Sequence, residues 1–143
     1  MRRILVLLGV KRIYEKASIT DGRRILVDRL WPRGVRRSTS NIDIWMKDIA
    51  PSEELRKWFA HDPKKWLVFK ARYWEELRKS NAFKSLQERI GIEDVTLVYA
   101  SSDNRHNNAV ALSSFLKSHA PKPKKDEIAK KVAEDLEREL QAY

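Results

Sequence analysis

The chain has 143 residues, of which 42% are hydrophobic and 35% are charged, and it contains no cysteine. This length suits one ordinary domain, and the hydrophobic fraction is sufficient for a core, which argues against disorder of the whole chain. The lack of cysteine excludes disulfides, zinc thiolate sites and thiol nucleophiles.

The net charge of +10 is concentrated at the front of the chain. Residues 1–37 contain eleven Lys and Arg against three Asp and Glu, whereas residues 120–143 contain six of each sign. A basic surface attracts anions, so it favours a small anionic ligand, a nucleic acid or an acidic protein as partner. Solubility alone explains the same charge equally well.

The N-terminus carries an apolar run over residues 4–10. This run is much shorter than the roughly 20 residues of a membrane span. No small-residue cleavage site follows it, as a signal peptide would require. We therefore expect a cytoplasmic protein without a membrane partner.

Strand-like and helix-like segments alternate along the chain. Residues 4–14, 25–27 and 95–100 are rich in Ile, Val and Leu and predict strands, and the continuous apolar run at 25–27 is typical of a strand covered on both faces. An amphipathic helix is predicted over residues 109–118. Strands separated by helices predict an α/β fold with a small, largely parallel sheet.

The middle of the chain is predicted to be helical. Ser40 and Asp43 have the spacing of a capping box and predict a helix that extends to Ile49. Ser52 is a second N-cap, and Asp62 before a proline is a third. A further helix is predicted to begin near residue 81. The helix that follows Asp62 has its apolar residues on one face, at Trp66, Phe69, Tyr73 and Leu77.

Two prolines near residue 120 separate the last helix from the domain. We therefore predict an α/β domain over residues 1–119, a Pro/Lys linker over 120–125 and a C-terminal helix over 126–143. Apolar residues recur every three or four positions on this helix, at Ile128, Val132, Leu136, Leu140 and Tyr143. Such a stripe either docks on its own domain or pairs with a second copy, and we favour a homodimer.

The first candidate site follows the strand at 25–27. Charged residues directly after a buried strand lie at its carboxyl end, where open α/β sheets bind ligands. Pro32 keeps Trp31 extended, and Gly34 permits a turn that leaves Arg33 free to bind a carboxylate or phosphate. Alternatively, Asp28 and Arg29 are paired inside the protein and Trp31 is part of the core. For Asp28 this structural interpretation is the stronger one.

The second candidate is His61 with Asp62. A histidine beside a carboxylate is a common acid–base arrangement, but neighbours in sequence rarely point the same way. Asp62 is therefore better explained as a helix cap. Lys47, Asp48 and Arg56 are further candidates for the same cleft.

The third candidate is the polar loop over residues 99–108, before the helix at 109–118. Free backbone N–H groups at a helix start can bind an anion, but Asn107 or Asn108 can equally be an ordinary N-cap. The sequence contains no metal-ligand spacing, serine elbow or nucleotide motif, so we predict no metal and no cofactor.

Several strings resemble the domain of unknown function 488 family, in its YeaO-like branch. The resemblance spans roughly residues 10–118, and its most distinctive string is Asp-Arg-Leu-Trp-Pro-Arg-Gly at 28–34. The other matching strings are residues 11–14, 21–22, 45–52, 55–59, 61–63 and 96–100.

Members of the family are largely uncharacterised. Other branches carry cysteines and a Cys-His-Arg string near the last strand, where this chain has Tyr99 and the segment 107–109, so any thiol chemistry of those branches does not transfer. The site that the resemblance implies consists of Asp28, Arg29, Trp31, Arg33, His61, Asp62, Asp103 and Asn107.

Two functions remain open at this stage. The first is a pocket protein for a small anionic ligand, in which Arg33 binds the ligand; His61, Asp62 and Asp28 are its candidate acid–base groups if it is an enzyme. The second is a nucleic-acid-binding module that uses the basic N-terminal third, which predicts affinity that falls steeply with salt. The sequence does not decide whether the protein is an enzyme.

Overall fold

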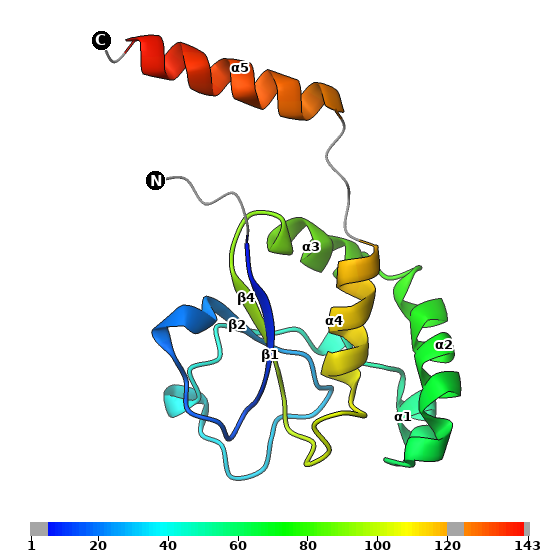
Figure 1. Cartoon of the computed structure of the whole chain (residues 1–143). Helices are drawn as coiled ribbons and strands as arrows, with labels where there is room; N and C mark the ends of the chain where they lie inside the picture. The colour runs from blue at the N-terminus through cyan, green and yellow to red at the C-terminus, as the bar shows by residue number, and fades with distance from the viewer. Residues whose placement is uncertain (1–5, 120–124, 142–143) are drawn as a thin grey trace.

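The fold is built on a four-stranded parallel sheet (Figure 1). The computed structural model describes residues 6–119 and 125–141. Its strands are β1 (Leu8–Arg12), β2 (Arg23–Leu26), β3 (Ile44–Trp45) and β4 (Val95–Tyr99), in the spatial order β1-β4-β2-β3. All neighbouring strands are parallel, which confirms the predicted α/β class.

The central strands are covered on both faces. Ile25, Leu26 and Val27 are each 0% exposed, as their continuous apolar run predicted. Ile25 and Val27 pack into the larger core under the helices, whereas Leu26 packs into a smaller core on the opposite face. The sheet therefore separates two apolar layers.

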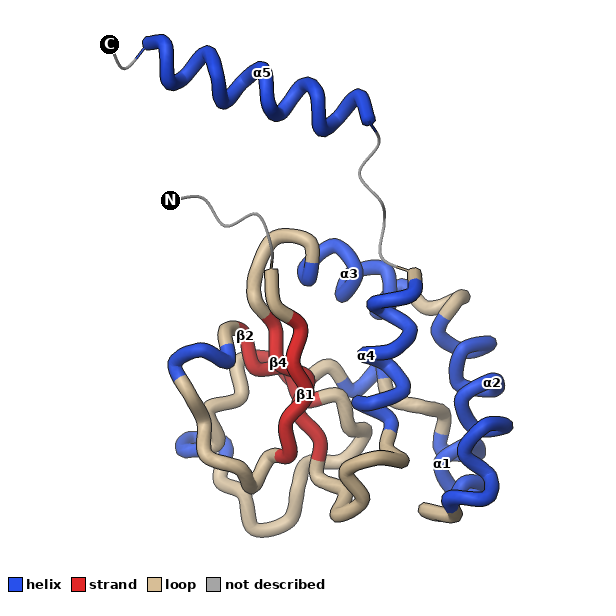
Figure 2. Tube along the Cα trace, viewed as in Figure 1, coloured by secondary structure: helices blue, strands red, loops and turns tan. Residues whose placement is uncertain are grey.

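Four helices cover one face of the sheet, and mostly loop lies on the other (Figure 2). Each of three helices begins at an N-cap side chain that accepts a backbone N–H, and the caps are Ser52, Ser80 and Asn107. The apolar face predicted around Tyr73 is confirmed, because Tyr73 is 0% exposed and its hydroxyl donates a hydrogen bond to the Ile49 carbonyl. The four helices are α1 (Glu53–Phe59), α2 (Trp66–Leu77), α3 (Asn81–Ile90) and α4 (Asn108–Ser118).

The helix predicted from Ser40 to Ile49 is wrong. This segment instead forms the short strand β3, followed by a single 3-10 turn at Lys47–Ile49. Asp43 does not complete a capping box, because its carboxylate accepts the backbone N–H of Arg24 in β2, at 2.8 Å, and its own N–H donates to the Arg24 carbonyl. Asn41 is left-handed, with φ of 56°, and turns the chain into this pairing. Long-range strand pairing thus overrides the local helix signal.

The face opposite the helices is covered by the segment over residues 28–42. Trp31 and Trp45 meet edge to face there, with their ring centroids 5.4 Å apart. The guanidinium of Arg37 lies 5.0 Å from the centre of each ring. Trp45 therefore belongs to a strand and to this second layer, and not to a helical stripe.

The C-terminal segment forms α5 (Lys125–Gln141), which lies apart from the sheet in Figure 1. Of its predicted stripe, Val132, Leu136 and Leu140 are 53%, 55% and 76% exposed. The side chain of Ile128 and the whole of Tyr143 lie outside the described residues. None of the helices within residues 6–119 and 125–141 is both long enough and apolar enough to cross a membrane.

Candidate functional site

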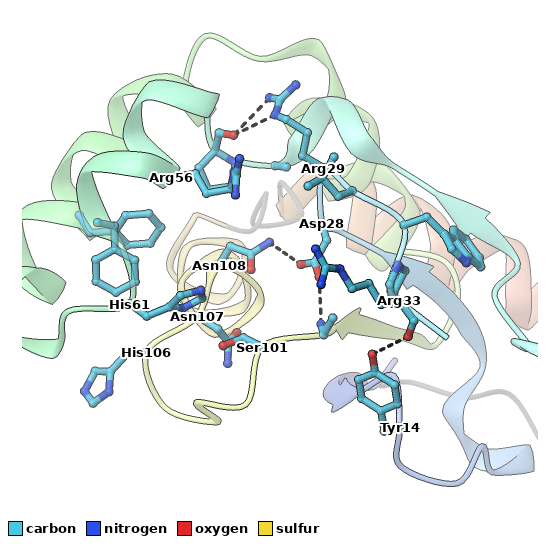
Figure 3. Close-up of a pocket in the computed structure, with 18 residues that line it drawn as sticks. Tyr14, Asp28, Arg29, Arg33, Arg56, His61, Ser101, His106, Asn107 and Asn108 are labelled. Carbon is cyan, nitrogen blue, oxygen red and sulfur yellow. Dashed lines mark hydrogen bonds between the residues drawn. The ribbon is translucent and has the colours of Figure 1, made fainter. Parts of the chain in front are cut away.

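A cavity of about 480 Å³ opens at the carboxyl ends of the parallel strands. This is the edge at which ligands bind in open α/β sheets. The loop after β2, helix α1 and the loop between β4 and α4 converge on it (Figure 3). Its polar lining consists of Tyr14, Asp28, Arg29, Arg33, Arg56, His61, Ser101, His106, Asn107 and Asn108.

Asp28 joins the elements beneath the cavity. Its carboxylate accepts the backbone N–H of Ala100 at 2.9 Å and the side-chain amide of Asn108 at 3.1 Å. Its main-chain carbonyl accepts the indole N–H of Trp45 at 2.8 Å. Burial raises the pKa of Asp28, although these two donors and the nearby His61 act in the opposite direction.

Asp28 and Arg29 both have partners inside the molecule, but they do not pair with each other. The Arg29 guanidinium instead donates to the Pro51 carbonyl at 3.2 and 3.3 Å, and no ion pair joins the two residues in the described part of the chain. Arg29 lines the cavity, but its guanidinium is used to hold the segment before α1. Its role is therefore largely structural.

Arg33 lies on the turn that Gly34 permits. Gly34 has a φ of 74°, a left-handed conformation that suits glycine, and the hydroxyl of Tyr14 donates to the Arg33 carbonyl at 3.0 Å. The Arg33 side chain extends into the cavity (Figure 3). Its guanidinium makes no hydrogen bond or ion pair with any residue that the structure describes, so it is available to a ligand.

Trp31 also borders the cavity, but its polar atom is occupied. The indole N–H donates to the Val35 carbonyl at 2.7 Å, and the ring packs into the smaller core. The alternative in which Trp31 is a core residue therefore agrees with its contacts.

His61 and Asp62 point in different directions. Asp62 does not line the cavity; its carboxylate accepts the N–H of Lys64 at 3.0 Å and caps the turn at Pro63–Lys65, as predicted. His61 lines the cavity and directs its ring toward the interior (Figure 3). Ala60 and His61 are both left-handed, with φ of 46° and 56°. Such a conformation costs about 1–2 kcal/mol per residue outside glycine, and backbone strain of this kind collects at functional sites.

The loop between β4 and α4 is organised by Asp103. Its carboxylate accepts the backbone N–H groups of Arg105 and His106, and these bonds lower the pKa of Asp103 to about 2. A second oxygen of Asp103 lies 3.0 Å from Nδ1 of His106. Because an ionised carboxylate only accepts, Nδ1 carries the proton and Nε2 of His106 is left free. Asp103 itself does not line the cavity, whereas His106 does.

Asn107 is the N-cap of α4, which is the ordinary alternative that the sequence offered. Its side-chain oxygen accepts the N–H of Val110 and its amide donates to the Asp103 carbonyl. Asn107 is 3% exposed and all its polar atoms are bonded, so its contact with the cavity is limited.

Tyr14 lines the cavity but was not a candidate from the sequence, and Ser101, His106 and Asn108 were included only as members of the polar loop over residues 99–108. The three-residue spacing of Asp103 and His106 was the one available signal for His106, because a carboxylate at that distance can cap a turn and hold an imidazole. Arg56 lines the cavity as we expected, but Lys47 and Asp48 do not. Within the described residues no three His, Asp or Glu side chains are grouped as a metal site would require.

The family described as the "Inactive DUF488-N3 subclade" matches residues 7–133. The match is wider than the resemblance seen in the sequence, since it includes the linker and the first part of α5. The chain belongs to this family.

Similar proteins with curated descriptions are themselves uncharacterised. The chain is 42% identical over 107 residues to "Uncharacterized protein Rv3073c" of Mycobacterium tuberculosis, an alignment that covers 75% of this chain and 91% of the relative. It is 38% identical over 109 residues to "Uncharacterized protein YeaO" of Escherichia coli, with 76% and 95% covered. No solved structure matches the chain. Its function is therefore unknown and has to be inferred from the site.

Proposed function

We propose that the cavity binds a small anionic metabolite, and that the protein acts by binding it without chemical conversion. The charge of the lining carries the proposal. Arg33 lies in the loop after β2, whereas Arg56 lies on α1 and His61 follows the end of α1. Arg56 also forms an exposed ion pair with Glu53, at 3.7 Å. Asp28 is the only acid among the described residues that line the cavity. Because two donors already hold the Asp28 carboxylate, the side chains that remain available favour an anion.

The geometry of Arg33 and His61 supports the same proposal. They enter the cavity from opposite sides (Figure 3), so one ligand between them would meet both. The left-handed backbone at His61 costs stability, and strain of this kind collects at functional sites. Binding without conversion agrees with the description of the family as inactive.

The test is thermal unfolding with a panel of phosphate, nucleotides and carboxylate metabolites, at low and high salt. The variant is Arg33→Gln, and its matched control is Arg36→Gln, an exposed arginine that does not line the cavity. A ligand at a hundred times its dissociation constant adds about 2.7 kcal/mol, which raises the melting temperature by about 5–10 °C. We expect one class of anion to give this shift in the wild type and in Arg36→Gln, but not in Arg33→Gln. Equal shifts in all three proteins would contradict the proposal.

Nucleic-acid binding is the alternative function, and the contacts of the basic residues make it weaker. Of the nine Lys and Arg between residues 6 and 37, six have partners inside the molecule. The clearest case is Asp21, which is 9% exposed and pairs with Lys11 and Arg24. Burial alone would raise the pKa of Asp21, but bonds from Ser18, Lys11 and Arg24 lower it. Lys11 and Arg24, which pair with the buried Asp21, stabilise the fold and are not available to phosphates.

A homodimer through α5 remains a proposal. The exposed stripe at Val132, Leu136 and Leu140 is identical in every copy, so two copies can bury it against each other. We likewise propose a division into a domain over residues 1–119, a linker over 120–125 and a terminal helix. Removal of the chain after His119 tests both proposals. It should change the oligomeric state and leave the melting temperature of the remaining domain unchanged.

A further inference from the structure

The cavity contains an apolar part that a simple inorganic anion would not use. Phe59 and Phe69 line it and stack on each other, with centroids 4.3 Å apart and planes inclined by 23°, and because they are only 5% and 2% exposed, little of either ring is open to a ligand. Ala50, Pro51 and Ala100 add further apolar lining. A strongly hydrated anion that touched only Arg33 and His61 would leave this surface wet, which is unfavourable.

Leu30 provides an independent observation at the rim. It lines the cavity, yet it is 63% exposed. Isolated exposed leucines are common on protein surfaces, but this one stands beside apolar cavity wall. A ligand with an apolar body would cover it, whereas a bare anion would not.

The size of the cavity agrees with a ligand of two parts. Pockets for small organic molecules have volumes of about 300–1,000 Å³ and combine apolar walls with a few polar groups that fix orientation. This cavity, at about 480 Å³, lies in that range. His61 stands between the two parts, because its ring lies 6.5 Å from that of Phe59 and faces the same space as Arg33 (Figure 3).

We infer that the ligand is a phosphate monoester attached to a planar aromatic ring. The phosphate lies against Arg33 and Arg56, since two guanidinium groups suit a dianion better than they suit a single carboxylate. The pair of Arg56 with Glu53, at 3.7 Å, is exposed and therefore weak, so it does not prevent this contact. The ring lies against Leu30 and His61, because an exposed apolar side chain and a flat imidazole favour a planar partner. This inference rests on the proposed function and adds the chemical class of the ligand.

Calorimetric titration with two matched pairs of compounds tests the ring. Phenyl phosphate and cyclohexyl phosphate carry the same anion on a planar and a puckered ring. AMP and ribose 5-phosphate differ only by the presence of the base. We expect phenyl phosphate and AMP to bind at least tenfold more tightly than their counterparts. If AMP alone shows the gain, the ring is that of a nucleotide; if phenyl phosphate shows it too, any aryl phosphate fits.

Two variants separate the ring from the phosphate. Leu30→Ser should weaken AMP about fivefold and leave ribose 5-phosphate unchanged, and Leu67→Ser is its control, since Leu67 is 76% exposed on α2 away from the cavity. Arg33→Gln should weaken both compounds. Equal affinities within each matched pair would overturn the inference that the ligand carries an aromatic ring. An equal effect of Leu30→Ser on AMP and ribose 5-phosphate would do the same. Neither result would contradict the binding of an anion in the cavity. If neither these phosphates nor any anion of the earlier panel binds, the proposed function fails as well.

Discussion

Replacement of Asp28 by asparagine should tighten anion binding. Asp28 is the only acid among the described cavity-lining residues, so its charge opposes any anion that enters. The asparagine side chain keeps the shape and one acceptor oxygen, and it can still accept from Ala100 or from Asn108. The substitution therefore removes a repulsive charge with little change in the cavity.

The size of this effect follows from the dimensions of the cavity. A sphere of 480 Å³ is about 10 Å across, and two unit charges at that separation interact by about 1.7 kcal/mol at an effective dielectric constant of about 20. Since 1.4 kcal/mol corresponds to a tenfold change in affinity, we expect about tenfold tighter binding at low salt. The gain should shrink in 0.15 M salt, where the screening length is about 8 Å.

Titration calorimetry with inorganic phosphate and with AMP measures this gain. Asp48→Asn is the matched control, because Asp48 is an exposed acid that does not line the cavity. Equal affinities of wild type and Asp28→Asn, with both proteins folded, would refute the placement of the anion in the cavity that Asp28 lines.

The same variant has a defined pH signature. Because burial raises the pKa of Asp28 in the folded state above its ordinary value of 3.8, the folded protein holds this proton more strongly than the unfolded chain does. The free energy of unfolding therefore decreases as pH rises from 3.8 through the raised pKa, and the loss is complete above it. Asp28→Asn lacks this contribution. In urea unfolding, its free energy of unfolding should therefore increase relative to that of the wild type as the pH rises through this range. A difference that stays constant with pH would contradict a raised pKa.

Two further substitutions and one truncation test the stability of the fold and the assembly of the protein. Tyr73→Phe leaves the buried Ile49 carbonyl without its donor and should lower the free energy of unfolding by about 1–2 kcal/mol in urea. Ala60→Gly removes the strain of a left-handed alanine and should raise the free energy of unfolding by about 0.5–1 kcal/mol. At an ordinary helical position, a change from alanine to glycine lowers the free energy of unfolding. Removal of residues after His119 should convert a dimer to a monomer in light scattering; a monomer before and after would rule out assembly through α5.

Local sequence patterns predicted most of the helices and the place of Arg33 in the site. Ser52 and Asp62 act as caps because capping depends on a few neighbouring residues, and the apolar run at Ile25 reports its burial directly. Arg33 could be assigned to the cavity because Gly34 and the end of a buried strand are both visible in the sequence. Each of these features is decided within a few residues.

The features that could not be predicted depend on distant partners. The pattern at Ser40 and Asp43 is compatible with a capping box, and only the pairing with Arg24, nineteen residues away from Asp43, converts it into a strand. His106 enters the site because Asp103 folds its loop back on itself. His61 faces the cavity because Ala60 and His61 adopt a conformation that single-residue preferences disfavour.

Asp28 is an acid in a cavity that we propose binds an anion, and its contacts explain why an acid is present there. Asp28 binds the end of β4 through Ala100, the start of α4 through Asn108 and, by its carbonyl, the side chain of Trp45 in β3. It therefore holds together the ends of three elements that surround the ligand space. Replacing it with an apolar residue would relieve the repulsion of an anion but leave buried donors without a partner. On this reasoning Asp28 is a positioning residue, and contact with the ligand falls to Arg33, Arg56 and His61. The side chains of Arg33 and His61 have no hydrogen-bonding partner in the described part of the chain.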